Sequence, residues 1–216
     1  MPINLLLHDI SRNGTVLLSS YRFSVPIIGL APGESTERDL SWLDAVGIYD
    51  LSADGKQFIF QYYGEGSGTN YTSYLRKTDG SPAKRLGDGA AIALSPDGKW
   101  VISVVNVPRQ IVLLPTGAGE SRRLDRPGIE DNGDNGWLPD GKRVVFTGRQ
   151  QGKPERTFIQ NIDGSAPQPI TPEGITGTFV SPDGKFLLVN DANGKRMLFV
   201  FGNTTTEDVR GLTIDD

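Results

Sequence analysis

Short apolar stretches alternate with polar turns along the whole chain, and Val, Ile, Phe and Tyr dominate them. No window of helical length carries apolar residues at i, i+3, i+4 and i+7. β-Branched and aromatic residues in short runs favour strands. The clearest runs are Val46–Leu51, Gln57–Tyr62, Ala90–Leu94, Trp100–Val105, Arg143–Thr147, Thr176–Val180 and Phe186–Val189. The pattern predicts an all-β chain with almost no helix.

One turn sequence recurs at a fixed interval of 43 residues. Its copies are Ser52–Lys56, Ser95–Lys99, Leu138–Lys142 and Ser181–Lys185, and a weaker copy, Ser11–Thr15, lies 41 residues before the first of them. Asp followed by Gly suits a type I turn that ends in a left-handed residue, and the Asp side chain bonds its own turn backbone. We therefore expect a structural role in hairpins for Asp54, Gly55, Asp97, Gly98, Asp140, Gly141, Asp183 and Gly184.

Each turn belongs to a unit with a third apolar stretch and a shorter, more polar fourth stretch. The units cover approximately 3–44, 45–88, 89–131, 132–174 and 175–216. Four strands in a period near 43 residues are typical of a β-propeller blade, whereas β-solenoid repeats are normally shorter. The sequence predicts one domain over 1–216 with five four-stranded antiparallel blades.

The order of strands leaves two arrangements open. Unit one begins with an inner-strand candidate at 3–10, and unit five ends with an outer-strand candidate at 209–213, so each blade is contiguous. The blades then form either a closed five-blade ring or an incomplete arc of a larger propeller. An arc would expose apolar blade faces and favour self-association.

Composition excludes several classes of function. The 27 glycines and 14 prolines supply the repeated turns, and no cysteine is present for disulfides or thiol chemistry. A net charge of −4 leaves no basic excess for nucleic acid. No apolar run is long enough to span a membrane, and no signal peptide is visible. The compartment stays open.

The turns and the strands around them resemble TolB-like propeller repeats, a branch of the WD40-like propellers. The stretches Gly29–Glu34, Tyr74–Pro82 and Leu113–Glu120 resemble the propeller region C-terminal to bacterial serine/threonine kinase domains. This resemblance implies a non-catalytic module that binds or senses a protein or small ligand, in a larger bacterial kinase-like or sensor protein. It suggests either an extracytoplasmic or a cytoplasmic domain. The kinase motifs His-Arg-Asp and Asp-Phe-Gly are absent from the sequence.

Tyrosines surround the glycine-rich segment Gly64–Gly68, which we expect to form a flexible hairpin loop. Tyr62, Tyr63 and Tyr71 are candidates for contact with a partner or a sugar, because tyrosine near a loop is typical of binding surfaces. Strand alternation could instead bury some of these rings between blades. A carbohydrate-binding propeller is therefore one alternative function.

Metal and catalytic chemistry have weaker support. Asp131 and Asp134 lie in a run of oxygen ligands, which makes them a weak calcium candidate, but the EF-hand glutamate is missing. His8 is the only histidine, so a multi-histidine metal site is excluded. A propeller hydrolase or lactonase is the other alternative, yet inner strands offer it only His8, Asp9 and Asp50. We expect no cofactor and no catalytic residue.

Overall fold

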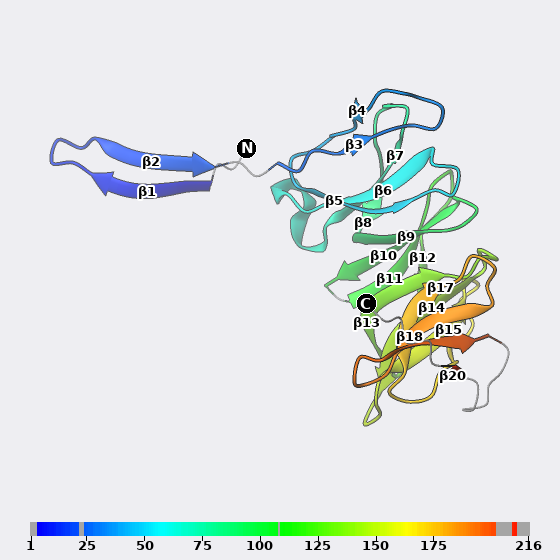
Figure 1. Cartoon of the computed structure of the whole chain (residues 1–216). Coiled ribbons are helices and arrows are strands. Elements are labelled where there is room, and N and C mark those ends of the chain that lie inside the picture. Colours follow the sequence, from blue (N-terminus) through cyan, green and yellow to red (C-terminus); the bar gives the residue numbers. More distant parts are fainter. Residues whose placement is uncertain (1–3, 22–23, 108, 202–208, 211–216) are drawn as a thin grey trace.

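The computed structural model describes residues 4–21, 24–107, 109–201 and 209–210, and antiparallel strands make up nearly all of its regular structure (Figure 1). The strands are β1 (Asn4–Ile10), β2 (Val16–Tyr21), β3 (Ile28–Gly29), β4 (Arg38–Asp39), β5 (Val46–Leu51), β6 (Gln57–Tyr62), β7 (Thr72–Lys77), β8 (Lys84–Asp88), β9 (Ala90–Leu94), β10 (Trp100–Asn106), β11 (Arg109–Pro115), β12 (Arg122–Leu124), β13 (Ile129–Trp137), β14 (Arg143–Gln150), β15 (Arg156–Asn161), β16 (Gln168–Pro169), β17 (Thr176–Val180), β18 (Phe186–Asn190), β19 (Arg196–Val200) and β20 (Val209–Arg210). A 3₁₀ helix, η1 (Glu65–Asn70), lies in the glycine-rich segment. The predicted all-β class is confirmed. Within the described ranges, no helix is long and apolar enough to cross a membrane.

Four complete blades follow one another along the chain. Their sheets are β5–β8, β9–β12, β13–β16 and β17–β20, each a four-stranded antiparallel meander. We call them blades two to five, in the order of the second to fifth predicted units; β13 begins at Ile129, before the predicted start of the fourth unit at 132. The inner strands β9 and β17 each pack over the first three strands of the blade before them, β9 on β5, β6 and β7 and β17 on β13, β14 and β15, while β13 packs mainly on β9.

The first unit is divided into two separate pairs of strands. β1 pairs with β2, and β3 pairs with β4, but the two pairs do not join into one sheet. The β1–β2 hairpin stands away from the other blades (Figure 1). The pair β3–β4 packs on blade two, because the adjoining residues Ile27 and Leu40 contact Phe58 and Phe60. The prediction of a fifth four-stranded blade is therefore not confirmed.

The hydrophobic cores lie between consecutive blades. Four clusters join unit one to blade two, blade two to three, three to four, and four to five. In Figure 1 the pair β3–β4 and the strands β17–β20 lie at opposite ends of the stack. Among the described residues, the blades therefore show no closed five-blade ring.

The repeated turns share one hydrogen-bond pattern. The hydroxyls of Ser52, Ser95 and Ser181 donate to the turn aspartates at 2.6–2.7 Å, and each aspartate also accepts the N–H of the following lysine at 3.1 Å. The turn glycines have φ values between +63° and +72°. In the remaining copy, where Leu138 replaces serine, Asp140 instead accepts from Lys142 and Arg143. The turns thus close each hairpin through local bonds.

Replacing Gly98 with alanine tests the turn. Gly98 has φ +69°, and an added Cβ would meet no atom within 4 Å, so only backbone strain remains. We expect the free energy of unfolding to fall by about 1 kcal/mol. The control is Gly117→Ala, where a Cβ again meets nothing but φ lies outside the left-handed region. Urea denaturation compares the two, and equal stabilities would contradict the assignment.

Acid should weaken the turns. The Ser52 hydroxyl and then the Lys56 N–H lower the pKa of Asp54, and the Ser181 hydroxyl and the Lys185 N–H do the same for Asp183. A lowered folded pKa means that the stabilisation is present above the unfolded pKa and is lost as pH falls through the folded pKa.

We expect the melting temperature of the wild-type chain to drop below about pH 4, the ordinary range of aspartate. The double variant Asp54→Asn, Asp183→Asn should respond less to acid, because an amide oxygen accepts the same bonds without titrating. Asn13 occupies this position in the first turn. Melting curves from neutral to acidic pH measure the effect, and parallel curves for both proteins would contradict it.

Candidate functional site

A groove of about 950 Å³ lies along the inner strands of blades two to five. We call it the inner groove. Consecutive residues of β9 and β17 line it, so both backbone and side chains of the inner strands form its wall. The lining residues are Tyr49, Asp50, Ile92, Ala93, Leu94, Asp134, Asn135, Gly136, Trp137, Thr147, Thr176, Gly177, Thr178, Phe179, Val180, Leu188, Asn190 and Arg196. Phe179 is largely exposed there. The groove therefore combines exposed aromatic surface with polar groups.

Two polar groups of the inner groove form hydrogen bonds between neighbouring blades, and a third, a buried hydroxyl, forms none among the described residues. Leu94 N donates to Asp50 Oδ2 at 2.9 Å, and Trp137 Nε1 donates to Ala93 O at 3.3 Å. The buried Thr147 Oγ1 has no hydrogen-bond partner among the described residues. A buried hydroxyl beside a groove is a position where a ligand or water can satisfy a hydrogen bond.

Three tyrosines gather at the blade-two end of the inner groove. The rings of Tyr63 and Tyr71 meet edge to face with centroids 6.5 Å apart, and Tyr63 Oη donates to Val46 O at 3.0 Å. Desolvation, followed by the nearness of Tyr63 and Tyr71, raises the pKa of Tyr49. Tyr49 and Tyr63 are 46% and 38% exposed, respectively. We call Tyr49, Tyr63 and Tyr71 the tyrosine cluster.

The structure thus brings together two of the three tyrosines singled out from the sequence and adds Tyr49. Tyr62 does not belong to the cluster, because its ring packs against the core of Phe58 and Phe60. Ile92 and Asn135, which lie one and two 43-residue intervals after Tyr49, also line the inner groove.

The glycine-rich segment is more ordered than a flexible hairpin loop. It forms η1, and Asn70 Oδ1 accepts the N–H groups of Asn106 and Val107 in blade three at 3.2 and 3.0 Å. Tyr71 follows η1 directly, with a left-handed φ of +62°. These bonds hold the segment in place and orient Tyr71 toward Tyr63.

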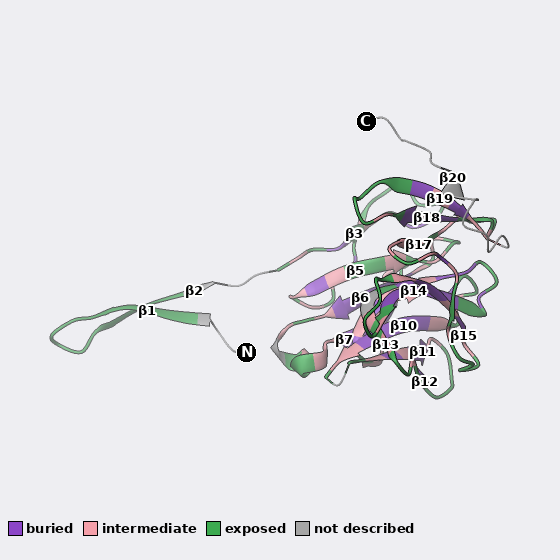
Figure 2. Cartoon of the chain, turned by 90° about the horizontal axis from the view of Figure 1, so that it is seen from below, coloured by how far each residue is buried: buried purple, intermediate pink, exposed green. Residues whose placement is uncertain are grey.

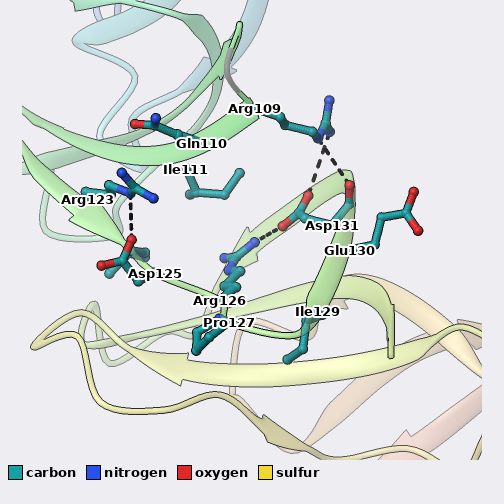
Figure 3. Close-up of a pocket in the computed structure, with 11 residues that line it drawn as sticks. Arg109, Gln110, Ile111, Arg123, Asp125, Arg126, Pro127, Ile129, Glu130 and Asp131 are labelled. Atoms are coloured by element: carbon teal, nitrogen blue, oxygen red, sulfur yellow. Dashed lines mark hydrogen bonds and ion pairs between the residues drawn. The ribbon is translucent and has the colours of Figure 1, made fainter. Parts of the chain in front are cut away.

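A second cavity, of about 640 Å³, lies between blades three and four (Figure 3). We call it the interblade pocket. Most of its charged side chains are paired. Arg126 pairs with Asp131, the Arg123 Nε lies 2.6 Å from Asp125 Oδ1, and Glu130 Oε2 accepts from Arg149 at 2.7 Å. These pairs balance the charge of the pocket.

Arg126 is the central side chain of the interblade pocket and is almost fully buried. Its Nε donates to Gln160 Oε1 at 3.1 Å, and its NH2 group donates to Asn135 Oδ1 at 3.0 Å. The guanidinium carbon lies 3.4 Å from the centroid of the Phe146 ring. Burial, followed by Arg109, lowers the pKa of Arg126 to about 9, so it stays cationic at neutral pH. Arg126 thus ties blade three to blade four.

The two calcium candidates, Asp131 and Asp134, line different cavities. Asp131 lines the interblade pocket, where it pairs with Arg126, and Asp134 lines the inner groove. Among the residues the structure describes, no group of three His, Asp or Glu side chains could hold a metal ion.

Of the three inner-strand candidates for catalysis, His8 and Asp9 are separated from Asp50. His8 and Asp9 lie on the β1–β2 hairpin, where His8 Nε2 is 2.7 Å from Ser19 Oγ. Asp50 lines the inner groove, and its carboxylate accepts a hydrogen bond from the Leu94 N–H. In the described part of the chain, these residues do not meet.

Solved structures share this architecture at low sequence identity. A TolB-type protein from Agrobacterium tumefaciens is 19% identical, with a TM-score of 0.63, over 93% of this chain and 78% of that one. TolB from Acinetobacter baumannii is 20% identical, with a TM-score of 0.55, over 81% and 47%. A prolyl endopeptidase is 13% identical, with a TM-score of 0.64, over 98% and 37%.

Neither a protein-family model nor a curated protein sequence matches the chain. The chain spans about half the length of TolB from Acinetobacter baumannii and a smaller part of the endopeptidase. Identities of 20% or less establish a shared fold and leave function to the site itself. The antiparallel blades of this chain share the β-propeller fold of these TolB structures.

Proposed function

We propose that this chain is a non-catalytic binding module that takes a protein segment or a small ligand at the tyrosine cluster and the adjoining inner groove. The observation that carries the proposal is the position of Tyr49. It belongs to the tyrosine cluster and also lines the inner groove, so exposed aromatic surface continues directly into a cavity.

The chemistry of this surface suits recognition. Tyrosine provides a large, rigid contact area and a hydroxyl at a small loss of conformational entropy. A volume of about 950 Å³ falls within the range of about 300–1,000 Å³ typical of ligand sites. The Thr147 hydroxyl and the exposed Phe179 add one polar and one apolar contact. A segment that carries both apolar and hydrogen-bonding groups fits this combination.

Two alternatives predict different ligands. A carbohydrate-binding propeller would use the same tyrosines, because sugar rings stack on aromatic faces. A propeller hydrolase or lactonase would need carboxylates or histidines grouped at the groove, and Asp50 and Asp134 are the only acidic residues among its lining side chains. The prolyl endopeptidase neighbour shares the fold with this chain and supports no catalytic step in it. We therefore propose that the chain is not an enzyme.

The kinase-like context rests on the motif resemblance of Gly29–Glu34, Tyr74–Pro82 and Leu113–Glu120. In that setting, the module would place a sensing surface beside a catalytic domain carried elsewhere. The reading frame around the coding sequence tests this part of the proposal, and a frame without a kinase or other signalling domain would contradict it.

Selection against the immobilised chain tests the binding function. A random peptide library and a glycan array are screened with the wild-type chain, and the affinity of each selected ligand is then measured on variants. We expect Tyr49→Ala and Tyr63→Ala to weaken binding about tenfold or more, the loss typical of an aromatic anchor. Arg123→Ala, on the exposed rim of the interblade pocket, is the matched control and should bind normally.

Circular dichroism confirms that each variant keeps its fold. Peptides that depend on Tyr49 support the protein-binding function, and glycans that depend on it support the carbohydrate-binding alternative. Hydrolysis of a chromogenic ester or a lactone by the wild-type chain would contradict the non-catalytic assignment. Ligands that bind equally well to all variants would contradict the site.

A further inference from the structure

The β1–β2 hairpin is exposed along its described length (Figure 2), and the consecutive residues Leu5, Leu6 and Leu7 place apolar side chains on both of its faces. Seven of its side chains are large, apolar and exposed: Leu5, Leu6, Leu7, Ile10, Val16, Leu17 and Leu18. A lone two-stranded hairpin is only marginally stable in water, and apolar surface of this kind marks an interaction site. The hairpin therefore requires a partner surface.

The hairpin has the features of the inner half of a blade. In its turn the Ser11 hydroxyl bonds Asn13 Oδ1, which also accepts Thr15 N–H, and Gly14 has φ +83°. This is the bonding pattern of the other blade turns. Counted from the turn glycine, Leu18 holds the place of Ile59 in blade two. Leu18 is 46% exposed, whereas Ile59 is fully buried.

A matching apolar cavity lies between β3 and β5. We call it the socket; it has a volume of about 500 Å³ and includes Ile28, Leu30, Ile48 and Leu51, which are all exposed. The counterparts of Ile48 and Leu51 one blade later, Ala91 and Leu94, are 0% and 6% exposed.

The difference has a structural cause. β9 is covered because it packs on the first three strands of blade two, and β17 is covered by blade four in the same way. On the side of the preceding unit, β5 has only the short pair β3–β4 beside it. The socket is thus the place where two inner strands are missing, and the hairpin consists of two inner strands.

We propose that the β1–β2 hairpin of a second copy of this chain fills the socket, while the hairpin of the first copy fills the socket of the second. β2 adds to the free edge of β3 in antiparallel register, with Leu18 opposite Ile28. The same register pairs Ile59 with Leu75 in blade two and Ile102 with Leu113 in blade three. The inference is independent of the proposed function.

The second copy is favoured because the β1–β2 hairpin extends away from β3 and β5 (Figure 1), the two strands that carry the residues of the socket. Reciprocal exchange buries both hairpins and both sockets with one two-fold axis, and this closed arrangement produces a dimer and no filament. The competing outcome is folding back. Leu18 and Ile28 are ten residues apart, as are the paired Leu188 and Leu198 of blade five, so a hairpin within one chain has the same connection length.

Cysteine pairing distinguishes the two outcomes, because the chain contains no cysteine. The full chain with Leu18→Cys and Ile28→Cys is prepared with ¹⁵N and without it, and the two forms are mixed, unfolded, refolded and oxidised. Directly opposed residues of antiparallel strands lie close enough for a disulfide. We expect covalent dimers and disulfide-linked peptides that combine labelled with unlabelled halves. Disulfides confined to one chain, or none, would overturn the proposal.

The wild-type background provides a second measurement. Light scattering after size exclusion should give twice the chain mass of 23.4 kDa. Leu18→Asp should reduce the mass to that of one chain, with the circular dichroism of the blades kept. Arg12→Asp, in the exposed turn of the same hairpin, should remain dimeric. A wild-type chain that stays monomeric at every concentration, or a Leu18→Asp variant that remains a dimer, would overturn the exchange.

Discussion

Replacing Arg126 with alanine is expected to lower the free energy of unfolding by about 3–5 kcal/mol, the loss typical when one partner of a buried ion pair is removed. The Arg126 guanidinium contacts Asp131, Asn135 and Gln160 and covers the Phe146 ring. The substitution removes the hydrogen-bonded cation that connects blade three to blade four. Urea denaturation with circular dichroism measures the change.

Arg123→Ala is the matched control for this prediction. Arg123 pairs with Asp125 in the same pocket, but both side chains are exposed, and such pairs contribute about 0–1 kcal/mol. A similar small loss for both variants would show that Arg126 is not a tie between blades. It would then be available to a ligand of the interblade pocket.

Phe146→Ala is expected to lower the free energy of unfolding by about 3–5 kcal/mol, as for other fully buried aromatic residues. Phe146 has no exposed surface, and its ring stacks on Phe158 with centroids 5.3 Å apart. Truncation leaves a cavity in the sheet of blade four and removes the ring beneath Arg126. Thermal and urea unfolding report the loss.

Phe179→Ala is the control, because Phe179 lies on an inner strand but is largely exposed in the inner groove. The free energy of unfolding of the Phe179→Ala variant should stay close to that of the wild-type chain. A comparable loss in both variants would contradict the assignment of Phe179 to a free surface. The effects of Arg126→Ala and Phe146→Ala should not add, since the two side chains are in contact.

Much of the fold follows from the sequence because the repeated turn fixes where strands begin. The predicted stretches Val46–Leu51, Gln57–Tyr62 and Thr176–Val180 coincide with β5, β6 and β17. The placement of β1 and β2 could not be predicted from the sequence. The local pattern predicts a strand and its turn, but it does not predict which sheet edge the strand joins. That choice depends on tertiary contacts such as those of Ile27 and Leu40 with blade two.

The site shows the same division between local and tertiary information. Tyr63 and Tyr71 were identified by their nearness to the glycine-rich segment, whereas Tyr49 lies earlier in the chain and reaches them only through the pairing of β5 with β6. The side-chain hydrogen bonds between blades could not be predicted from the sequence either. Arg76 and Gln160 hold equivalent register positions, opposite Phe58 and Val144, and both bond the preceding blade. Nothing in their chemical type indicates a shared role.

Hydrogen exchange of the full chain, measured with and without a ligand selected on the wild-type protein, tests the proposed binding surface most directly. We expect slower exchange in the peptides that cover 46–51, 62–71 and 176–180, which contain the tyrosine cluster and Phe179. Exchange elsewhere should be unchanged. Protection confined to the interblade pocket around 123–131, with none at 46–51 or 62–71, would contradict binding at the tyrosine cluster and the inner groove.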